Sequence, residues 1–352
     1  MNSFYIGDFE ISQNGKPFII AEMSGNHNQS IEKAFEIVDA AAKAGAHGLK
    51  LQTYTPDTIT IDHNEGLFYI DDPNSLWHGH SLYQLYEKAY TPWEWHEPIF
   101  KRAKEKGLIP FSSPFDNTSV DFLEELGAPV YKVASFENKD RRLLKKIAST
   151  GKPVIMSTGA STLEDISESV QVLRDNGCKD LILLKCTSTY PSSPENTNLL
   201  TIPHMSQIFN CFTGLSDHTA GIGAAVASVP LGAKVIEKHF TISRADGGVD
   251  AAFSLEPNEL EALVVETERA WQALGEVSYK VLNAERSSLR FKRSIYVVKD
   301  IEEGEELDES NIRVIRPGDG MEPKYFDLVL GAKAIKSIKR GTPLAWDIIL
   351  SK

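Results

Sequence analysis

The sequence has few cysteines and no long apolar run. Its three cysteines, Cys178, Cys186 and Cys211, are odd in number and lack C-x-x-C spacing, so neither a disulfide framework nor a zinc knuckle is indicated. The longest weakly polar run, 221–236, is interrupted by a proline and a glycine, and the first residues lack the basic and apolar regions of a signal peptide. We therefore expect no membrane span and a location in the reducing cytoplasm.

An excess of positive charge is also missing. The chain has 37 Lys and Arg residues against 49 Asp and Glu residues, for a formal net charge of -12. Nucleic acids and acidic membrane surfaces bind clustered Lys and Arg, so we expect neither as a partner. A few converging lysines could still form a local pocket for an anionic small molecule.

The chain of 352 residues is long enough for one large domain and a small one. From residue 18 onward, short apolar segments alternate with amphipathic ones, which is typical of βα units. The predicted strands are 18–23, 48–54, 108–113, 129–135, 153–159, 180–188, 211–217 and 234–240. The predicted helices include 30–45, 93–107, 163–177 and 257–275. Eight such units in about 270 residues predict an α/β fold, the TIM (β/α)8 barrel.

The pattern changes after Gly275, where short runs rich in glycine and charge begin. KDIEEGEEL (299–307) and KSIKRGTPL (336–344) share their Lys, Ile, Gly and Leu positions. Two copies of one β-turn unit predict a small all-β domain, which at about 60 residues buries little surface on its own. We therefore predict a barrel domain at 1–280, a linker at 281–289 and the small domain at 290–352.

The longest connection in the predicted barrel, 55–90, follows the second strand and is rich in aromatic residues. Loops after barrel strands lie on the catalytic face, so this segment is a candidate lid or specificity element. A plain surface excursion is the alternative, and the sequence does not separate the two.

Polar residues gather at the C-terminal ends of the predicted strands, which face the substrate in a TIM barrel. They are Glu22, Lys50, Gln52, Ser112, Ser113, Lys132, Ser135, Glu137, Ser157, Thr158, Lys185, Thr187, Ser216, Asp217, His218, Glu237 and His239. Several apolar strands that end in lysine would be costly in a plain core, because an unpaired buried ammonium is strongly penalised. Lysines beside neutral hydroxyl donors predict an anion site.

Two histidines, His218 and His239, each close a short apolar run and should lie at neighbouring strand ends. Neutral imidazole is a common ligand of catalytic divalent metals. The alternative is that each histidine only completes a buried polar network. Because an anion site is predicted on the same face, we favour metal-assisted chemistry on a phosphorylated or carboxylated small molecule, with Glu22 as a further oxygen ligand or a base.

Eight motifs together resemble the sialic acid synthase family. They are IIAEMSGNHN (19–28), GLKLQTY (48–54), YKVASFE (131–137), VIMSTG (154–159), LKCTSTYPS (184–192), GLSDHT (214–219), EKHFT (237–241) and RPGDG (316–320). The resemblance covers nearly the whole chain. It implies an N-terminal TIM barrel followed by an antifreeze-like (SAF) domain of β-clip type.

The resemblance also implies a reaction and a set of site residues. The family condenses phosphoenolpyruvate with an N-acetylated aldose, as its open-chain aldehyde, to a nonulosonic acid and phosphate by C–O cleavage, with Mn²⁺ or Mg²⁺. The implied metal ligands are His218 and His239, with Glu22 close by. The implied phosphoenolpyruvate contacts are Lys50, Lys132, Ser135, Ser157 and Ser216, and the implied sugar contacts are Gln52, Glu137, Tyr190 and Asp250. Ser113, Lys185 and Ser188 complete the predicted substrate contacts.

Arg316 matches an arginine that the antifreeze-like domain lends to the partner subunit, so the resemblance implies a domain-swapped homodimer. The water that adds during the reaction needs a carboxylate, and both Glu22 and Glu137 are candidates.

Some residues depart from the neuraminate-making members of the family. Ser188 stands where those members typically have Asn, and ADGGVDAAFSLEP (245–257) replaces a PGPDH-like segment. This segment and YEKAYTPWEWH (86–96) are more similar to the pseudaminic acid synthases, whose aldose is 2,4-diacetamido-2,4,6-trideoxy-altropyranose. Neuraminate or legionaminate synthesis is the alternative activity. A catalytically silent barrel that binds a carbohydrate or another ligand is the alternative of a different class.

Overall fold

The computed structural model describes residues 1–350, and the last two residues of the predicted small domain lie outside the described residues. The chain forms two compact units, Met1–Gly275 and a second that begins at Glu276. The division therefore lies a few residues before the boundary we predicted at 280. No helix among the described residues is long and apolar enough to cross a membrane.

The first unit is a closed barrel of eight parallel strands, as the sequence predicts. The strands are β3 (Phe18–Glu22), β4 (Gly48–Thr53), β5 (Ile109–Pro114), β6 (Tyr131–Val133), β7 (Val154–Ser157), β8 (Leu181–Cys186), β9 (Phe212–Asp217) and β10 (Ala233–His239). They follow one another around the barrel in chain order, and β10 closes it by pairing with β3. Each strand lies within or next to its predicted range.

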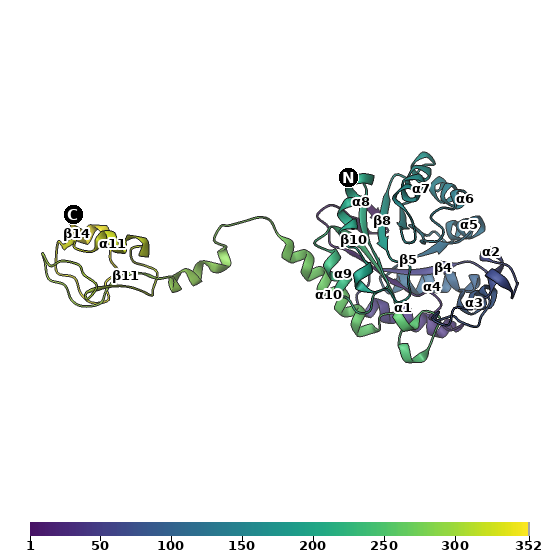
Figure 1. Ribbon diagram of the computed structural model, residues 1–352, viewed down its shortest axis with the longest axis horizontal. Helices are drawn as coiled ribbons and strands as arrows, with labels where there is room; N and C mark the ends of the chain where they lie inside the picture. Colours follow the sequence, from purple (N-terminus) through teal and green to yellow (C-terminus); the bar gives the residue numbers. More distant parts are fainter. Residues whose placement is uncertain (351–352) are drawn as a thin grey trace. The chain divides into compact units, whose positions relative to one another are not determined.

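Helices connect the strands and surround the barrel (Figure 1). They are α1 (Ile31–Lys43), α4 (Trp93–Glu105), α5 (Asn117–Glu125), α6 (Arg141–Ser149), α7 (Leu163–Asp175), α8 (Thr201–Phe209), α9 (Gly223–Ser228) and α10 (Pro257–Leu274). Ser30 caps α1 by accepting a hydrogen bond from the Lys33 amide, which satisfies one of the free donors of the first turn. The helices place every βα loop at one end of the barrel.

An N-terminal hairpin, β1 (Phe4–Ile6) and β2 (Phe9–Ile11), precedes the barrel and was not predicted. It closes the end of the barrel where the strands begin. The Phe4 ring lies 5.8 Å from the Phe212 ring, and the Phe9 ring lies 4.9 Å from the Phe18 ring. The hairpin and the lower barrel interior form one apolar cluster.

The long connection after β4 contains α2 (Pro56–Ile59), a 3-10 turn (Gly66–Phe68) and α3 (Leu82–Ala89). Ser81 caps α3 through the Gln84 amide, and the Gln84 side chain accepts from the Ser81 amide in return. Part of the long connection is therefore regular secondary structure.

The second unit is a small β-rich fold with its own apolar core. Its strands are β11 (Ser294–Val297), β12 (Ile312–Ile315), β13 (Lys333–Ala334) and β14 (Ile349–Leu350), with one short helix, α11 (Phe326–Val329). Ile301 and Ile338, which hold equivalent positions in the two sequence repeats, exchange backbone hydrogen bonds of 2.9 and 2.8 Å. The repeat is therefore also a structural pair.

Five further short segments are 3-10 turns. They are Pro194–Asn196, Arg244–Asp246, Ala251–Phe253, Pro323–Tyr325 and Trp346–Ile348. A longer 3-10 stretch, Asn283–Phe291, includes most of the predicted linker.

We expect Gly214→Ala to destabilise the barrel, because a methyl group at this position of β9 would collide with the Val235 carbonyl oxygen and meet Leu184 Cδ2 at 2.8 Å. Overpacking of this kind costs about 1–3 kcal/mol or more. Urea unfolding should show this loss in the free energy of unfolding. Gly223→Ala is the matched control: it lies in α9, meets no atom within 4 Å, and should be neutral or slightly stabilising. Equal stability of the two variants would contradict the packing argument.

Candidate active site

Alternation along the strands decides which side chains face the barrel interior, because successive residues point to opposite sides of the wall. In β3, Phe18 and Ile20 belong to the interior cluster, whereas Ile19 and Ala21 pack toward the helices. Glu22 therefore faces inward. By the same alternation the inward residues at the C-terminal ends are Glu22, Lys50, Gln52, Ser113, Lys132, Ser157, Cys186, Ser216, Glu237 and His239.

Two lysines and two glutamates from four strands form a buried charge cluster. Lys50 Nζ lies 2.6 Å from Glu22 Oε2 and 3.8 Å from Glu237 Oε2. Lys132 Nζ lies 3.7 Å from Glu237 Oε1. The exposed fraction of all four residues is 4% or less. Such charges are tolerated away from water only when they are paired and hydrogen-bonded.

Neutral hydroxyl and amide groups surround this charge cluster. Lys50 donates to Ser113 Oγ at 3.3 Å, and Lys132 donates to Ser157 Oγ at 2.7 Å. Ser216 donates to Glu237 Oε1 at 3.0 Å, and Gln52 donates to Glu22 Oε1 at 3.0 Å. Ammonium and hydroxyl donors that converge at one place are suited to bind a phosphate or a carboxylate. The structure thus brings together most of the predicted anion contacts.

The two glutamates have opposite pKa shifts. Burial raises the pKa of Glu22 to about 7, although the Lys50 ammonium lowers it. Burial also acts to raise the pKa of Glu237, but Lys132 and Lys50 outweigh it and hold that pKa below its ordinary value. Glu237 is therefore the ionised partner of the lysines, and Glu22 can exchange a proton near neutral pH.

His218 and His239 converge next to the charge cluster, with ring centroids 5.3 Å apart. His218 Nδ1 lies 3.0 Å from the Thr187 carbonyl oxygen, so this nitrogen carries a proton, and in the neutral ring Nε2 keeps the lone pair. Burial holds the pKa of His239 well below its ordinary value, which favours the neutral ring. Within residues 1–350 no group of three or more His, Cys, Asp or Glu side chains forms a ready-made metal site.

A buried ion pair on the outer side of the same two strands holds the histidines in register. Lys238 and Asp217, which immediately precede His239 and His218, are 0% and 2% exposed. Lys238 Nζ donates to Asp217 Oδ2 at 2.9 Å and to the carbonyl oxygens of Thr219 and Gly221 at 2.6 and 2.8 Å. All three ammonium protons have acceptors, so the pair ties β10 to the loop that carries His218.

Aromatic side chains cover the outer side of the histidine pair. The Tyr190 ring lies 4.4 Å from the His218 ring, and the Phe253 ring lies 4.9 Å from the His239 ring and 5.2 Å from Tyr190. Asp250 is buried beside them: its Oδ2 lies 3.6 Å from His239 Nδ1 and accepts a short hydrogen bond from Ser24. The predicted sugar contacts Tyr190 and Asp250 therefore lie next to the histidines.

Three other predicted residues lie in loops at the same end of the barrel. Ser135 Oγ accepts from the Gly159 amide at 3.1 Å, and Ser188 Oγ lies 3.7 Å from Cys186 Sγ. Glu137 follows β6, and its Oε2 atom is buried without a hydrogen-bond partner. Burial raises the pKa of the Glu137 carboxyl to about 7, although Lys132 lowers it.

The structure does not bring Lys185 into the cluster. In β8, Ile182 and Leu184 face the interior, so Lys185 points toward the helices, and its Nζ donates to the Cys186 carbonyl oxygen at 2.8 Å. The prediction of Lys185 as part of the lysine cluster is therefore wrong, because its strand position has the opposite orientation from Lys50 and Lys132. Arg316 belongs to the second unit, directly after β12.

Glu237 is one of the predicted strand-end residues, but no role is predicted for it from the sequence. It lies two residues before His239 and therefore on the same face of β10. That spacing could have predicted an inward-facing Glu237, because residues two positions apart in a strand point to the same side.

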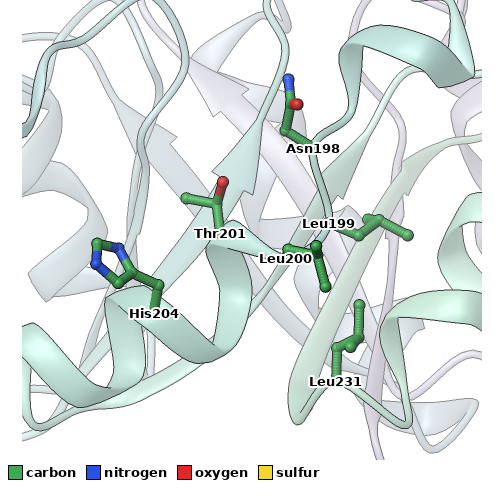
Figure 2. A pocket seen from close by; sticks show the side chains of 6 residues that line it. All are labelled: Asn198, Leu199, Leu200, Thr201, His204 and Leu231. Carbon is green, nitrogen blue, oxygen red and sulfur yellow. The ribbon is translucent and has the colours of Figure 1, made fainter.

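A separate hollow of about 400 Å³ lies around the start of α8. It is lined by Asn198, Leu199, Leu200, Thr201, His204 and Leu231, none of which is a predicted site residue. Figure 2 shows the three leucines on one side and His204 on the helix at the other. With no charged cluster in its lining, this hollow lacks the chemistry of the barrel mouth.

Two known protein families match most of the chain. The NeuB family model matches residues 37–279, and the SAF domain model matches residues 292–350. The chain belongs to the NeuB family. Its fold is accordingly the barrel and SAF domain combination of that family.

Close relatives extend over nearly the whole of this NeuB family chain. The pseudaminic acid synthase of Campylobacter jejuni (serotype O:2, strain NCTC 11168) is 42% identical over 96% of this chain and 98% of its own length. That of Helicobacter pylori is 42% identical over 95% and 98%. The crystal structure of N-acetylneuraminic acid synthetase from Leptospira borgpetersenii, in complex with citrate, has a TM-score of 0.71 and 29% identity, covering 82% of this chain and 95% of that one.

We expect Glu137→Gln to reduce the pH dependence of stability. A carboxyl whose pKa is about 7 in the folded state, above the ordinary 4.5, binds its proton more tightly when folded. Its contribution to the free energy of unfolding is therefore present below pH 4.5 and is lost as the pH rises through about 7. Urea unfolding across this range should show a smaller decline for the variant than for the wild type. Identical slopes would show that Glu137 does not titrate in this range.

Proposed function

We propose that this NeuB family protein is a pseudaminic acid synthase. It condenses phosphoenolpyruvate with 2,4-diacetamido-2,4,6-trideoxy-altropyranose, in its open-chain aldehyde form, to a nonulosonic acid and phosphate. The observation that carries the proposal is the pair of buried lysines, Lys50 and Lys132, with hydroxyl donors around them and two imidazoles alongside. The 42% identity to pseudaminic acid synthases over nearly the full length supports this choice of sugar.

The lysines and serines bind the anionic groups of phosphoenolpyruvate in this proposal. Lys50 and Lys132 supply the positive charge. Ser113 and Ser157 accept hydrogen bonds from these lysines and keep their own hydroxyl protons for the anion. Ser216 is a further proposed contact, and its hydroxyl donates to Glu237 Oε1 in the structure. Gln52, Glu137, Tyr190 and Asp250 are the proposed sugar contacts. Ser135 and Ser188 lie in the loops beside them.

The bound groups are then aligned for addition of the enol to the aldehyde. C3 of phosphoenolpyruvate forms a bond to the aldehyde carbon, whose oxygen takes up a proton. Water adds to C2 and gives a proton to a carboxylate. Glu22 and Glu137 both have a pKa of about 7, which suits proton transfer near neutral pH. We assign this role to Glu22, because it lies 2.6 Å from the Lys50 ammonium that would bind phosphoenolpyruvate, whereas Glu137 is a proposed sugar contact. The bond from C2 to the phosphate oxygen breaks and its electrons leave with phosphate. The hydroxyl on C2 gives its proton to that phosphate, and C2 becomes the ketone carbon.

A divalent cation, Mn²⁺ or Mg²⁺, fits the donor set of His218 and His239. The free Nε2 of His218 and the neutral ring of His239 are suitable nitrogen donors, and two protein ligands leave positions open for substrate. When bound, such an ion would polarise the aldehyde oxygen.

Removal of divalent metal should abolish turnover, and added Mn²⁺ or Mg²⁺ should restore it. His239→Ala should lose both turnover and metal binding, because one of only two nitrogen ligands is gone. Metal binding is measured by isothermal titration and turnover by phosphate release. Full activity after chelation, with no metal retained, would contradict the metal role.

The proposed activity is tested by mass spectrometry of the products. Purified protein is incubated with phosphoenolpyruvate and, in turn, the diacetamido altrose derivative, its legionaminate-type isomer and N-acetylmannosamine. We expect the altrose-type substrate to give the highest kcat/KM. Preference for another aldose would indicate the neuraminate or legionaminate alternative. No product from any aldose would favour the non-catalytic alternative.

We further propose a domain-swapped homodimer in which Arg316 reaches the partner's barrel. In support, the first residues of the second unit expose large apolar side chains, with Val277 92%, Tyr279 99% and Phe291 58% exposed. Exposed apolar side chains of this size, where they gather into one patch, mark interaction surfaces. The cytoplasmic location expected from the three unpaired cysteines stays a prediction.

Mixing two inactive variants tests the shared site. Arg316→Ala and Lys50→Ala should each be inactive, and subunit exchange should return part of the activity. A mixed dimer contains one barrel with its own Lys50 and its partner's intact Arg316. If Arg316 acts within its own chain, every site lacks one of the two groups and no activity returns. Light scattering on the mixture verifies that dimers are present.

A further inference from the structure

Trp77, in the connection after β4, reaches across to the loop that follows β10. Its indole Nε1 donates to the Val249 carbonyl oxygen at 3.0 Å. Its ring lies 5.9 Å from the ring of Tyr190. A residue from the long connection is thus attached to the segment next to Asp250 and stands against an aromatic ring of the site.

The Trp77 ring extends an apolar surface that begins at the histidine pair. Tyr190 contacts His218 and Phe253, and Phe253 contacts His239. Beyond Tyr190 the next ring is Trp77. A substrate whose aldehyde lies at the histidines would extend along these rings, away from the buried lysines.

We propose that Trp77 is a specificity-determining residue that selects an aldose ending in a methyl group over one ending in a hydroxymethyl group. This inference rests on the proposed function and names the part of the sugar that the aromatic surface recognises. Indole has a single hydrogen-bond donor and no acceptor, and Trp77 already uses that donor on Val249. The indole N–H therefore has no hydrogen bond left for a hydroxyl, which would lose its bond to water without a new partner, whereas a methyl group has no such bond to lose.

The expected preference is moderate. An apolar surface rejects an analogue that adds one hydroxyl by about 100-fold at most, because it only withholds a hydrogen bond. We therefore expect kcat/KM to favour the 6-deoxy aldose by roughly 10- to 100-fold over its 6-hydroxy counterpart.

The experiment compares wild type, Trp77→Ala, Trp77→Phe and Leu76→Ala. Phenylalanine keeps an apolar ring and removes the bond to Val249, whereas alanine removes both. Leu76 is 50% exposed, precedes Trp77 and lines the same hollow, so Leu76→Ala is the control that removes an apolar side chain there but keeps the Trp77 ring. The readouts are kcat/KM for the 6-deoxy and 6-hydroxy diacetamido aldoses, the KM for phosphoenolpyruvate, and the thermal midpoint of each variant.

We expect Trp77→Ala to lower the 6-deoxy preference at least tenfold with an unchanged KM for phosphoenolpyruvate. Trp77→Phe and Leu76→Ala should keep the wild-type preference. The inference is overturned if Trp77→Ala keeps the preference, or if Trp77→Phe loses it as fully, since the bond to Val249 and not the ring would then matter. If wild type turns over neither aldose, the proposed function itself fails.

Discussion

The burial of two ammonium groups among carboxylates at one end of the barrel is the interaction on which the rest of the site depends. Removing Lys50 and Lys132 from water costs several kcal/mol per ion, and only paired charges and hydroxyl donors at good geometry offset that cost. Four strands must therefore end in register. The closed barrel provides this, because its strands follow one another around a ring in which each neighbour fixes the next.

The same constraint explains the arrangement on the outer side of the wall. The side chains that alternate with the histidines are themselves charged, and they pair with each other as Asp217 and Lys238. In β9 and β10, functional side chains therefore point into the barrel, while the neighbouring side chains on the outer face form the ion pair that holds them in place. This support joins β10 to the loop after β9, so the two imidazoles keep their 5.3 Å separation without bonding to each other.

Much of the fold and part of the site could be predicted from sequence. Short apolar segments between amphipathic ones predict the barrel correctly, because this alternation can be read locally along the sequence. Strand ends located Glu22 and Lys50, but only the alternation of side chains in the folded strand separates Lys132, which faces inward, from Lys185, which does not. The hairpin β1–β2 was missed because two strands of three residues carry too short a pattern. Arg316 lies in a separate unit, so its proposed role depends on assembly, which sequence pattern does not specify.

The hairpin β1–β2 at the base of the barrel determines from which end ligands can enter. The hairpin and the lower barrel interior form one apolar cluster that includes the phenylalanines of the hairpin. This end of the barrel is therefore closed, and small molecules reach the interior only from the end that carries the site. Glu237 lies two residues before His239 along β10, which is about 6.5 Å further from the open end as measured along the strand. A ligand held by the lysines therefore sits beneath one held at the histidines. Because the barrel interior opens at one end only, the ligand held by the lysines must enter before the one at the histidines. The product formed from the deeper ligand must leave last.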